Sequence, residues 1–111
     1  MEKRIYFKDT EPSELMEKYA NEKLVKIEEF LKNEPSPVYI NLTFAPSKVH
    51  SHNKVELQVV SPHYDLFNSY EYPGTEFYDV LDRVIDVMYR RLLEEKAKRI
   101  DNIRRGEPKL D

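Results

Sequence analysis

The sequence contains no cysteine, only two glycines and no long apolar segment. Without cysteine the chain can form neither a disulfide nor a thiolate metal site, which suits a reducing compartment. The first residues lead directly into charged sequence, and no stretch approaches the roughly 18 apolar residues of a membrane span. We therefore expect a cytoplasmic protein. Gly74 and Gly106 fall at the ends of predicted helices, so no glycine-rich phosphate loop is present.

Charged and aromatic side chains are abundant. The 111 residues are 35% charged, 40% hydrophobic and 12% aromatic, a composition typical of one small soluble domain rather than a disordered chain. We predict a single domain at residues 1–105 and a C-terminal tail at residues 106–111. The net charge of -3 argues mildly against a nucleic-acid binder, so the distribution of the charges matters more than their sum.

A long helix from residue 75 to about residue 105 dominates the sequence. Its apolar residues recur at steps of three and four, which places them on one face of a helix; they are Phe77, Leu81, Val84, Met88 and Leu92. Beyond Leu92 the core-facing positions are Glu95 and Arg99, which are rarely buried unpaired. Roughly 30 helical residues span about 45 Å, whereas strands of six or seven residues span about 23 Å. The helix is therefore predicted to run past its core and leave an overhang for a partner.

In the rest of the chain, alternating apolar and polar residues predict four strands, and apolar residues at helical spacing predict one more helix. The helix is expected to be capped by Asp9 or Thr10 and to end at about Asn33, before Pro35. The strands are predicted at residues 3–8, 38–44, 54–60 and 64–70. The strands at residues 38–44 and 54–60 are expected to pair antiparallel, with Leu42 and Leu57 buried beneath the helices. The predicted class is α+β with the order β-α-β-β-β-α: a four-stranded, largely antiparallel sheet with two helices packed on one face.

Few residues are placed for catalysis or metal binding. His50 and His52 would share a face on a strand, but no third ligand with suitable spacing is evident, and a polar loop is the favoured interpretation. The acidic pairs, including Asp82 and Asp86, are interpreted as solvated helix faces because no apolar pocket is predicted around them. We expect no catalysis, no metal site and no cofactor.

Basic residues of the long helix gather towards its C-terminal end and towards one side. Favourable interaction with the helix macrodipole explains the first trend but not the second. The basic track is defined as the cations within about 100° of one another, predicted opposite the apolar stripe: Arg83, Arg90, Arg91, Lys98 and Arg105. On the first helix, Lys23 and Lys26 are expected to border the groove between the helices. A phosphate backbone and an acidic protein are both suitable partners for such a surface.

The sequence resembles the ribosome hibernation-promoting factor and ribosome-associated inhibitor family in its short form. The matching segments cover nearly the whole chain in order, and the most specific is the Tyr-x-x-x-Asp segment at Tyr78 and Asp82. The segments are residues 13–15, 23–27, 54–57, 77–86, 90–92 and 96–98. The family departs from this chain at Val87, where it often has lysine. The resemblance implies the same β-α-β-β-β-α order as that predicted above from the residue patterns.

By that resemblance the protein is not an enzyme. It is expected to bind the small ribosomal subunit in the cleft used by messenger and transfer RNA, silencing idle ribosomes under stress or starvation, and to be monomeric off the ribosome. The residues implied as contacts to ribosomal RNA are Lys23, Lys26, Arg83, Arg90, Arg91, Lys96 and Lys98. Arg99 is added to them from its charge alone.

A second interpretation is a non-catalytic protein-interaction module on the same scaffold. In this interpretation acidic surface has displaced the RNA contacts. The net negative charge and the acidic pair Glu94 and Glu95 favour it. Neither interpretation involves a membrane or a small-molecule substrate.

Overall fold

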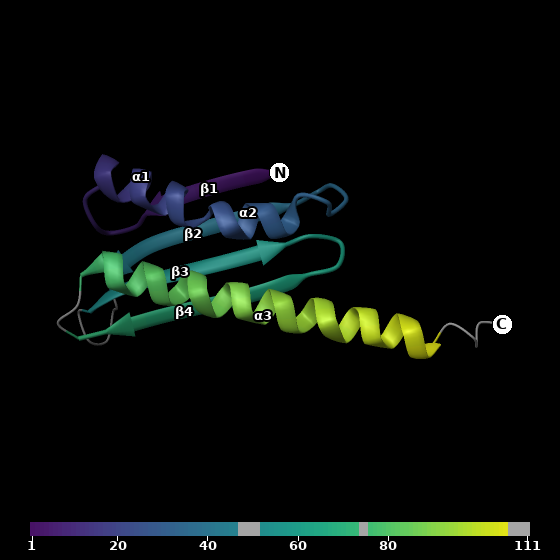
Figure 1. The fold of residues 1–111 in the computed structure, drawn as a ribbon. Coiled ribbons are helices and arrows are strands. Elements are labelled where there is room, and N and C mark those ends of the chain that lie inside the picture. The colour runs from purple at the N-terminus through teal and green to yellow at the C-terminus, as the bar shows by residue number, and fades with distance from the viewer. Residues whose placement is uncertain (47–51, 74–75, 107–111) are drawn as a thin grey trace.

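Within residues 1–46, 52–73 and 76–106, which the computed structural model describes, three helices cover one face of a four-stranded sheet (Figure 1). The elements follow the order β1 (Glu2–Phe7), α1 (Glu14–Lys23), α2 (Val25–Leu31), β2 (Tyr39–Pro46), β3 (Asn53–Val60), β4 (Asp65–Tyr72) and α3 (Phe77–Gly106). The α+β class and the arrangement of helices on one face are as predicted.

The strands lie in sequence order across the sheet, β1-β2-β3-β4. β1 runs parallel to β2, and the other two pairs are antiparallel, because only the first connection carries helices across the sheet. Leu42 lies opposite Leu57 in the antiparallel pair, and both side chains are fully buried, which confirms the predicted pairing and burial. The strand bounds differ from the predicted ones by one or two residues at several ends.

The predicted first helix is divided into α1 and α2 at Leu24, so the prediction of two helices in all was wrong. The N–H of Leu24 bonds to the carbonyls of Ala20 and Glu22, and Ile27 donates to the carbonyl of Leu24 at 3.0 Å. These shorter-range bonds tighten the turn around Leu24. The three-residue step from Leu24 to Ile27 fits a regular or a tightened turn, and both side chains are fully buried. Apolar spacing alone therefore did not reveal the division.

The cap of α1 is Ser13, not Asp9 or Thr10. Its side-chain oxygen accepts a hydrogen bond from the N–H of Met16 at 3.1 Å, and its backbone is extended, as expected for an N-cap. Asp9 instead has a positive φ of 54°, which an aspartate tolerates in a turn. The helix therefore begins later than a cap at Asp9 or Thr10 predicts.

α3 lies across the sheet over β3 and β4 and continues beyond the β3–β4 turn, as Figure 1 shows. Its proximal half, residues 77–92, carries the buried stripe that ends at Leu92. Its distal half, residues 93–106, continues past the buried stripe. The predicted overhang starts only after Arg99, later than expected, because Arg99 still contacts Tyr64. No described helix is long and apolar enough to cross a membrane. Gly106 is the last residue of α3, and the division into a domain and a tail at residues 106–111 stays a prediction.

Candidate nucleic-acid interface

A groove of about 600 Å³ separates α1 and α2 from the proximal half of α3. Phe30, Ile85 and Tyr89 supply apolar lining, and Lys23 and Lys26 line it as predicted from the sequence. The two lysines project from the end of α1 and the start of α2, one turn apart, so both reach α3.

Each groove lysine is held by a carboxylate and by an aromatic ring. The ammonium of Lys23 lies 3.5 Å from Asp82 and 5.6 Å from the centre of the Tyr19 ring. The ammonium of Lys26 lies 2.7 Å from Asp86 and 5.2 Å from the centre of the Tyr89 ring. The positive charges of Lys23 and Lys26 are thus compensated within the protein. Their assignment as RNA contacts stays a prediction.

Asp82 also joins α1 to α3 through Tyr19. The Tyr19 hydroxyl donates to both carboxylate oxygens of Asp82, at 2.9 and 3.1 Å. Burial, together with the hydrogen bond and charge of Asp82, raises the pKa of Tyr19 to about 12. Tyr78 packs edge-on against Tyr19, with ring centres 4.9 Å apart. The Tyr78 and Asp82 segment that carried the family resemblance therefore has a structural role, which the interpretation of Asp82 as a solvated residue missed.

The basic track lies on the flank of α3 that faces the edge strand β4. Arg91 is half-buried there and donates to the carbonyl of Phe67 at 2.6 Å and to the side-chain oxygen of Asn68 at 3.1 Å. Arg83 is exposed and lies over the Tyr70 ring at 5.4 Å. The basic track was predicted to lie opposite the apolar stripe. This prediction was wrong for Arg91, because β4 packs against the flank of α3 that carries Arg91.

Besides Arg83, three predicted contacts are exposed cations on α3. Neither Arg90 nor Lys96 forms an ion pair with any residue in the described ranges. Lys96 lies over the Phe30 ring at 5.6 Å, whereas Lys98 is 3.5 Å from Glu95 on the same helix and keeps a side chain that is 71% exposed. Such an exposed pair within one helix contributes little. These ammonium and guanidinium groups are available to an anionic partner. The side chain of Arg105, the last member of the track, lies outside the described part of the chain.

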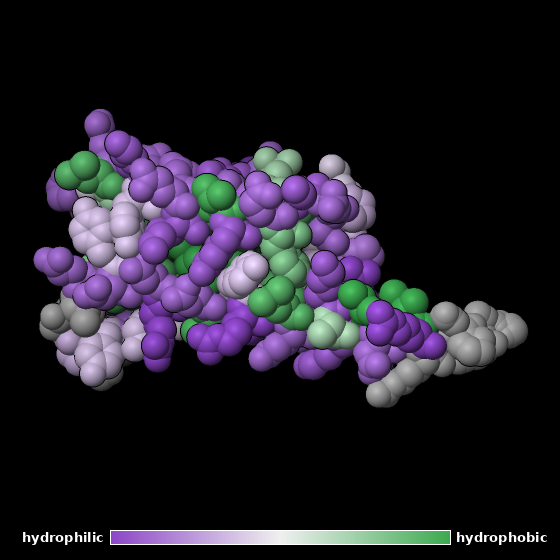
Figure 2. Space-filling model, in the orientation of Figure 1, coloured by the Kyte–Doolittle hydropathy of each residue, from purple (hydrophilic) through white to green (hydrophobic). Residues whose placement is uncertain are grey.

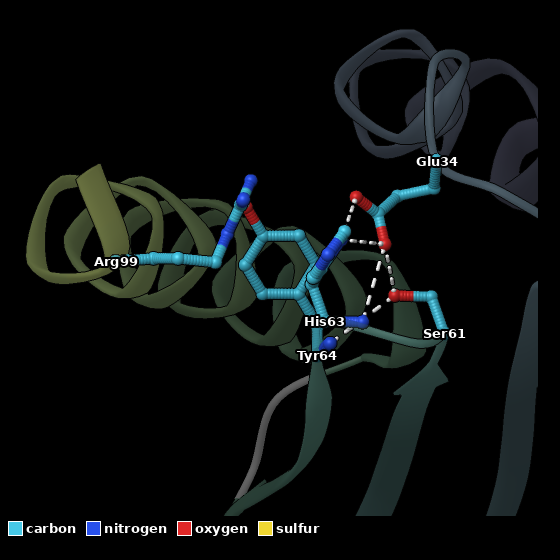
Figure 3. A network of polar contacts seen from close by, with 5 residues as sticks. All are labelled: Glu34, Ser61, His63, Tyr64 and Arg99. Carbon is cyan, nitrogen blue, oxygen red and sulfur yellow. Dashed lines mark hydrogen bonds and ion pairs between the residues drawn. The ribbon is translucent and has the colours of Figure 1, made fainter. Parts of the chain in front are cut away.

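Arg99 belongs to a polar network at the end of the sheet (Figure 3). Its guanidinium lies over the Tyr64 ring at 5.7 Å and donates to the Tyr64 hydroxyl at 3.4 Å. Nearby, Glu34 accepts from the Ser61 hydroxyl at 2.7 Å and lies 3.0 Å from Nδ1 of His63. Tyr64 is buried, so Arg99 is anchored to the edge of the core rather than projecting freely.

The Glu34 carboxyl is held in its charged form. Burial alone would raise its pKa, but hydrogen bonds from the Ser61 side chain and from the side chain and backbone of His63 keep the pKa below its ordinary value. The charged carboxylate therefore ties the end of α2 to the β3–β4 turn on which Arg99 rests.

The histidine pair can be followed only in part, because His50 lies outside the described residues. Nδ1 of His52 is 3.6 Å from the Glu71 carboxylate. Across residues 1–46, 52–73 and 76–106 no group of three histidine, aspartate, glutamate or cysteine side chains is placed to hold a metal ion.

Comparison with known proteins adds to these observations. The sequence model of the family described as Sigma 54 modulation protein / S30EA ribosomal protein matches residues 4–100. No individually curated protein matches the chain significantly.

Among solved structures, the fold is similar to a ribosomal subunit interface protein from Coxiella burnetii, with a TM-score of 0.68 and 17% identity over 87% of this chain and 99% of that one. It is also similar to the N-terminal domain of Protein Y from Thermus thermophilus, with a TM-score of 0.63 and 15% identity over 80% of this chain and 91% of that one. At these identities the likeness establishes the fold alone.

Proposed function

The chain belongs to the Sigma 54 modulation protein / S30EA ribosomal protein family, and from this premise we propose that it is a ribosome-binding inhibitor of translation. In this proposal it occupies the messenger and transfer RNA cleft of the small ribosomal subunit when cells are under stress, and it excludes both RNAs sterically. Its partners are that subunit and its ribosomal RNA. It acts in the cytoplasm without catalysis, as a monomer off the ribosome.

The observation that carries this proposal is that several cations on α3 are exposed and are not paired with carboxylates of the other described elements. Arg90 and Lys96 are exposed without a described acidic partner, and Lys98 is nearly as free. A phosphate that approaches these groups replaces water and counterions, not an existing carboxylate, so little is lost on binding. At Lys23 and Lys26 a phosphate would have to compete with Asp82 and Asp86. We therefore assign the leading RNA contacts to α3.

The fold supports this role mechanically. Fully buried side chains join the helices to the sheet, so the exposed cations are carried by a rigid body. Contacts from lysine and arginine to phosphates fix the position of a protein without reading base identity. Binding should therefore depend strongly on salt and weakly on RNA sequence.

A second candidate is the non-catalytic protein-interaction module. The compensated charges of Lys23 and Lys26, together with the net charge of -3, favour it, because both reduce attraction to RNA. It predicts weak binding to ribosomes that is insensitive to changes in the basic track.

Co-sedimentation with purified small subunits tests the proposal. The triple variant Arg83→Glu, Arg90→Glu and Lys98→Glu keeps Arg91, whose bonds to β4 belong to the fold. We expect it to lose association and to flatten the logarithmic salt dependence by roughly 0.7 to 0.9 units for each phosphate contact removed.

The matched control reverses three exposed lysines outside α3, Lys8→Glu, Lys18→Glu and Lys32→Glu. It makes the same change in net charge and should leave most binding intact. Equal losses in both variants would mean that only net charge matters. An unchanged affinity and salt slope in a folded triple variant would defeat the assignment to α3.

A further inference from the structure

The distal half of α3 carries an apolar stripe beyond the last core side chain of the helix, Leu92. The distal stripe consists of Leu93, Ala97, Ile100 and Ile103, which recur at steps of four, three and three and so lie within about 120° of one another on the helix. Leu93 is 44% exposed and Ile103 is 55% exposed. Single exposed apolar residues are ordinary, but a row on one helix face is the pattern of a binding surface.

The hydrophobic core of the described residues does not extend over this stripe, although Ile100 is half-buried. The side chains of the hydrophobic core end at Leu92, and Leu93, Ile100 and Ile103 neither belong to that cluster nor pack against it. Figure 2 shows apolar side chains on the distal part of α3, where the helix has left the sheet. Leu93 and Ile103 of the stripe are therefore accessible to a helix of another molecule.

The charged residues within the sector of the helix that the stripe occupies are all basic. Between Tyr89 and Arg104, this sector contains Lys96 and Arg104 but no acidic residue. Glu94 and Asp101 lie further round the helix, and Glu95 points towards the sheet side. An apolar row that contains the cations Lys96 and Arg104 complements an apolar row that contains carboxylates.

We infer that the distal stripe binds an acidic amphipathic helix of a partner protein. The partner's apolar residues, spaced at three and four, pack against Leu93, Ile100 and Ile103, while its carboxylates pair with Lys96 and Arg104. A second copy of this chain fits less well, since a twofold contact would bring these cations towards one another. RNA gains little from aliphatic side chains. This inference shares Lys96 with the RNA contacts proposed above, but its apolar residues Leu93, Ile100 and Ile103 are not among those contacts.

Fluorescence anisotropy with two labelled synthetic peptides tests the inference. Both are helices of about 18 residues, or five turns, with leucine on one face; one has glutamate elsewhere and the other has lysine. The protein should bind the glutamate peptide saturably and the lysine peptide much more weakly. Leu93→Ser with Ile103→Ser should weaken binding by about tenfold or more, and Lys96→Glu with Arg104→Glu should abolish it.

The matched controls are Leu15→Ser, which changes an apolar residue that is 72% exposed on α1, and Lys18→Glu. Both should bind like the original protein, and circular dichroism should show every variant folded. Failure to bind the glutamate peptide, equal binding of both peptides, or unchanged binding by the serine variant would overturn the inference.

Two further results would assign the stripe to another occupant and also overturn it. One is a dimer in size-exclusion chromatography with light scattering that the serine variant dissociates. The other is binding of single-stranded oligouridylate that the serine variant loses. Ribosome association of the serine variant should be unchanged, so this test and the test of the basic track fail independently.

Discussion

The two halves of α3 are both rich in charge, yet they differ in what those charges contact. In the proximal half, Asp82 and Asp86 pair with lysines from the first two helices, and Arg91 bonds to β4. In the distal half, Lys96 and Arg99 contact single aromatic rings at the edge of the core, and Lys98 pairs only within the helix. One half holds the domain together, and the other leaves most of its side chains exposed to solvent.

This difference shows that residue type does not tell a structural cation from a binding one. Arg90 and Arg91 are adjacent and chemically identical, but one is exposed and the other is half-buried against β4. A helix turns by about 100° per residue, so neighbouring residues meet different surroundings. The position of the neighbouring strand decides which role each arginine has.

The largest expected difference between the halves is in stability. Leu81→Ala removes a fully buried side chain from the proximal half and should lower the free energy of unfolding by about 3 kcal/mol, from lost burial and a residual cavity. Ile103→Ala in the distal half should change it by less than about 0.5 kcal/mol. Urea denaturation followed by circular dichroism measures both. Similar losses at the two positions would show that the distal half is packed after all.

A smaller effect should separate the two adjacent arginines. Arg91→Ala removes hydrogen bonds to the Phe67 carbonyl and the Asn68 side chain and should cost about 1–2 kcal/mol of stability. Arg90→Ala is the matched control and should stay within about 0.5 kcal/mol. Ribosome binding should respond in the opposite order, with the larger loss at Arg90. If both variants lose stability equally, Arg91 is not the residue that fastens α3 to β4.

Much of this fold could be predicted from the sequence, because alternation and helical spacing report directly on burial. Val55, Leu57 and Val59 alternate with polar residues, and all three are buried as that pattern requires. The division of the first helix at Leu24 was missed, since backbone hydrogen bonding is not encoded in apolar spacing. The strand ends were uncertain for a related reason: an end depends on pairing with a neighbour.

The site was less predictable. The cations of α3 were found from charge and periodicity, which are local properties. The pairing of Lys26 with Asp86 joins residues 60 positions apart, and no local pattern connects them. Arg91 was placed on the wrong side because the helical period gives relative angles but does not say where the edge strand lies. Sequence reasoning therefore found candidate residues and left their surroundings unknown.

The smallest expected effect concerns the network that supports the first turns of the distal half. Glu34 is buried and its pKa is lowered in the folded protein, so the charged carboxylate stabilises the fold above its ordinary pKa of 4.5. That stabilisation is lost as the pH falls through the lower folded-state pKa. Glu34→Gln should cost about 1 kcal/mol at neutral pH, and the gap from the original protein should close as the pH falls below 4.5. Glu29→Gln, at an exposed pair with Lys32, is the control and should leave the acid limb of the stability curve unchanged. Urea denaturation across this pH range gives the result, and a gap that does not vary with pH would show that the charge of Glu34 does not anchor the turn beneath Arg99.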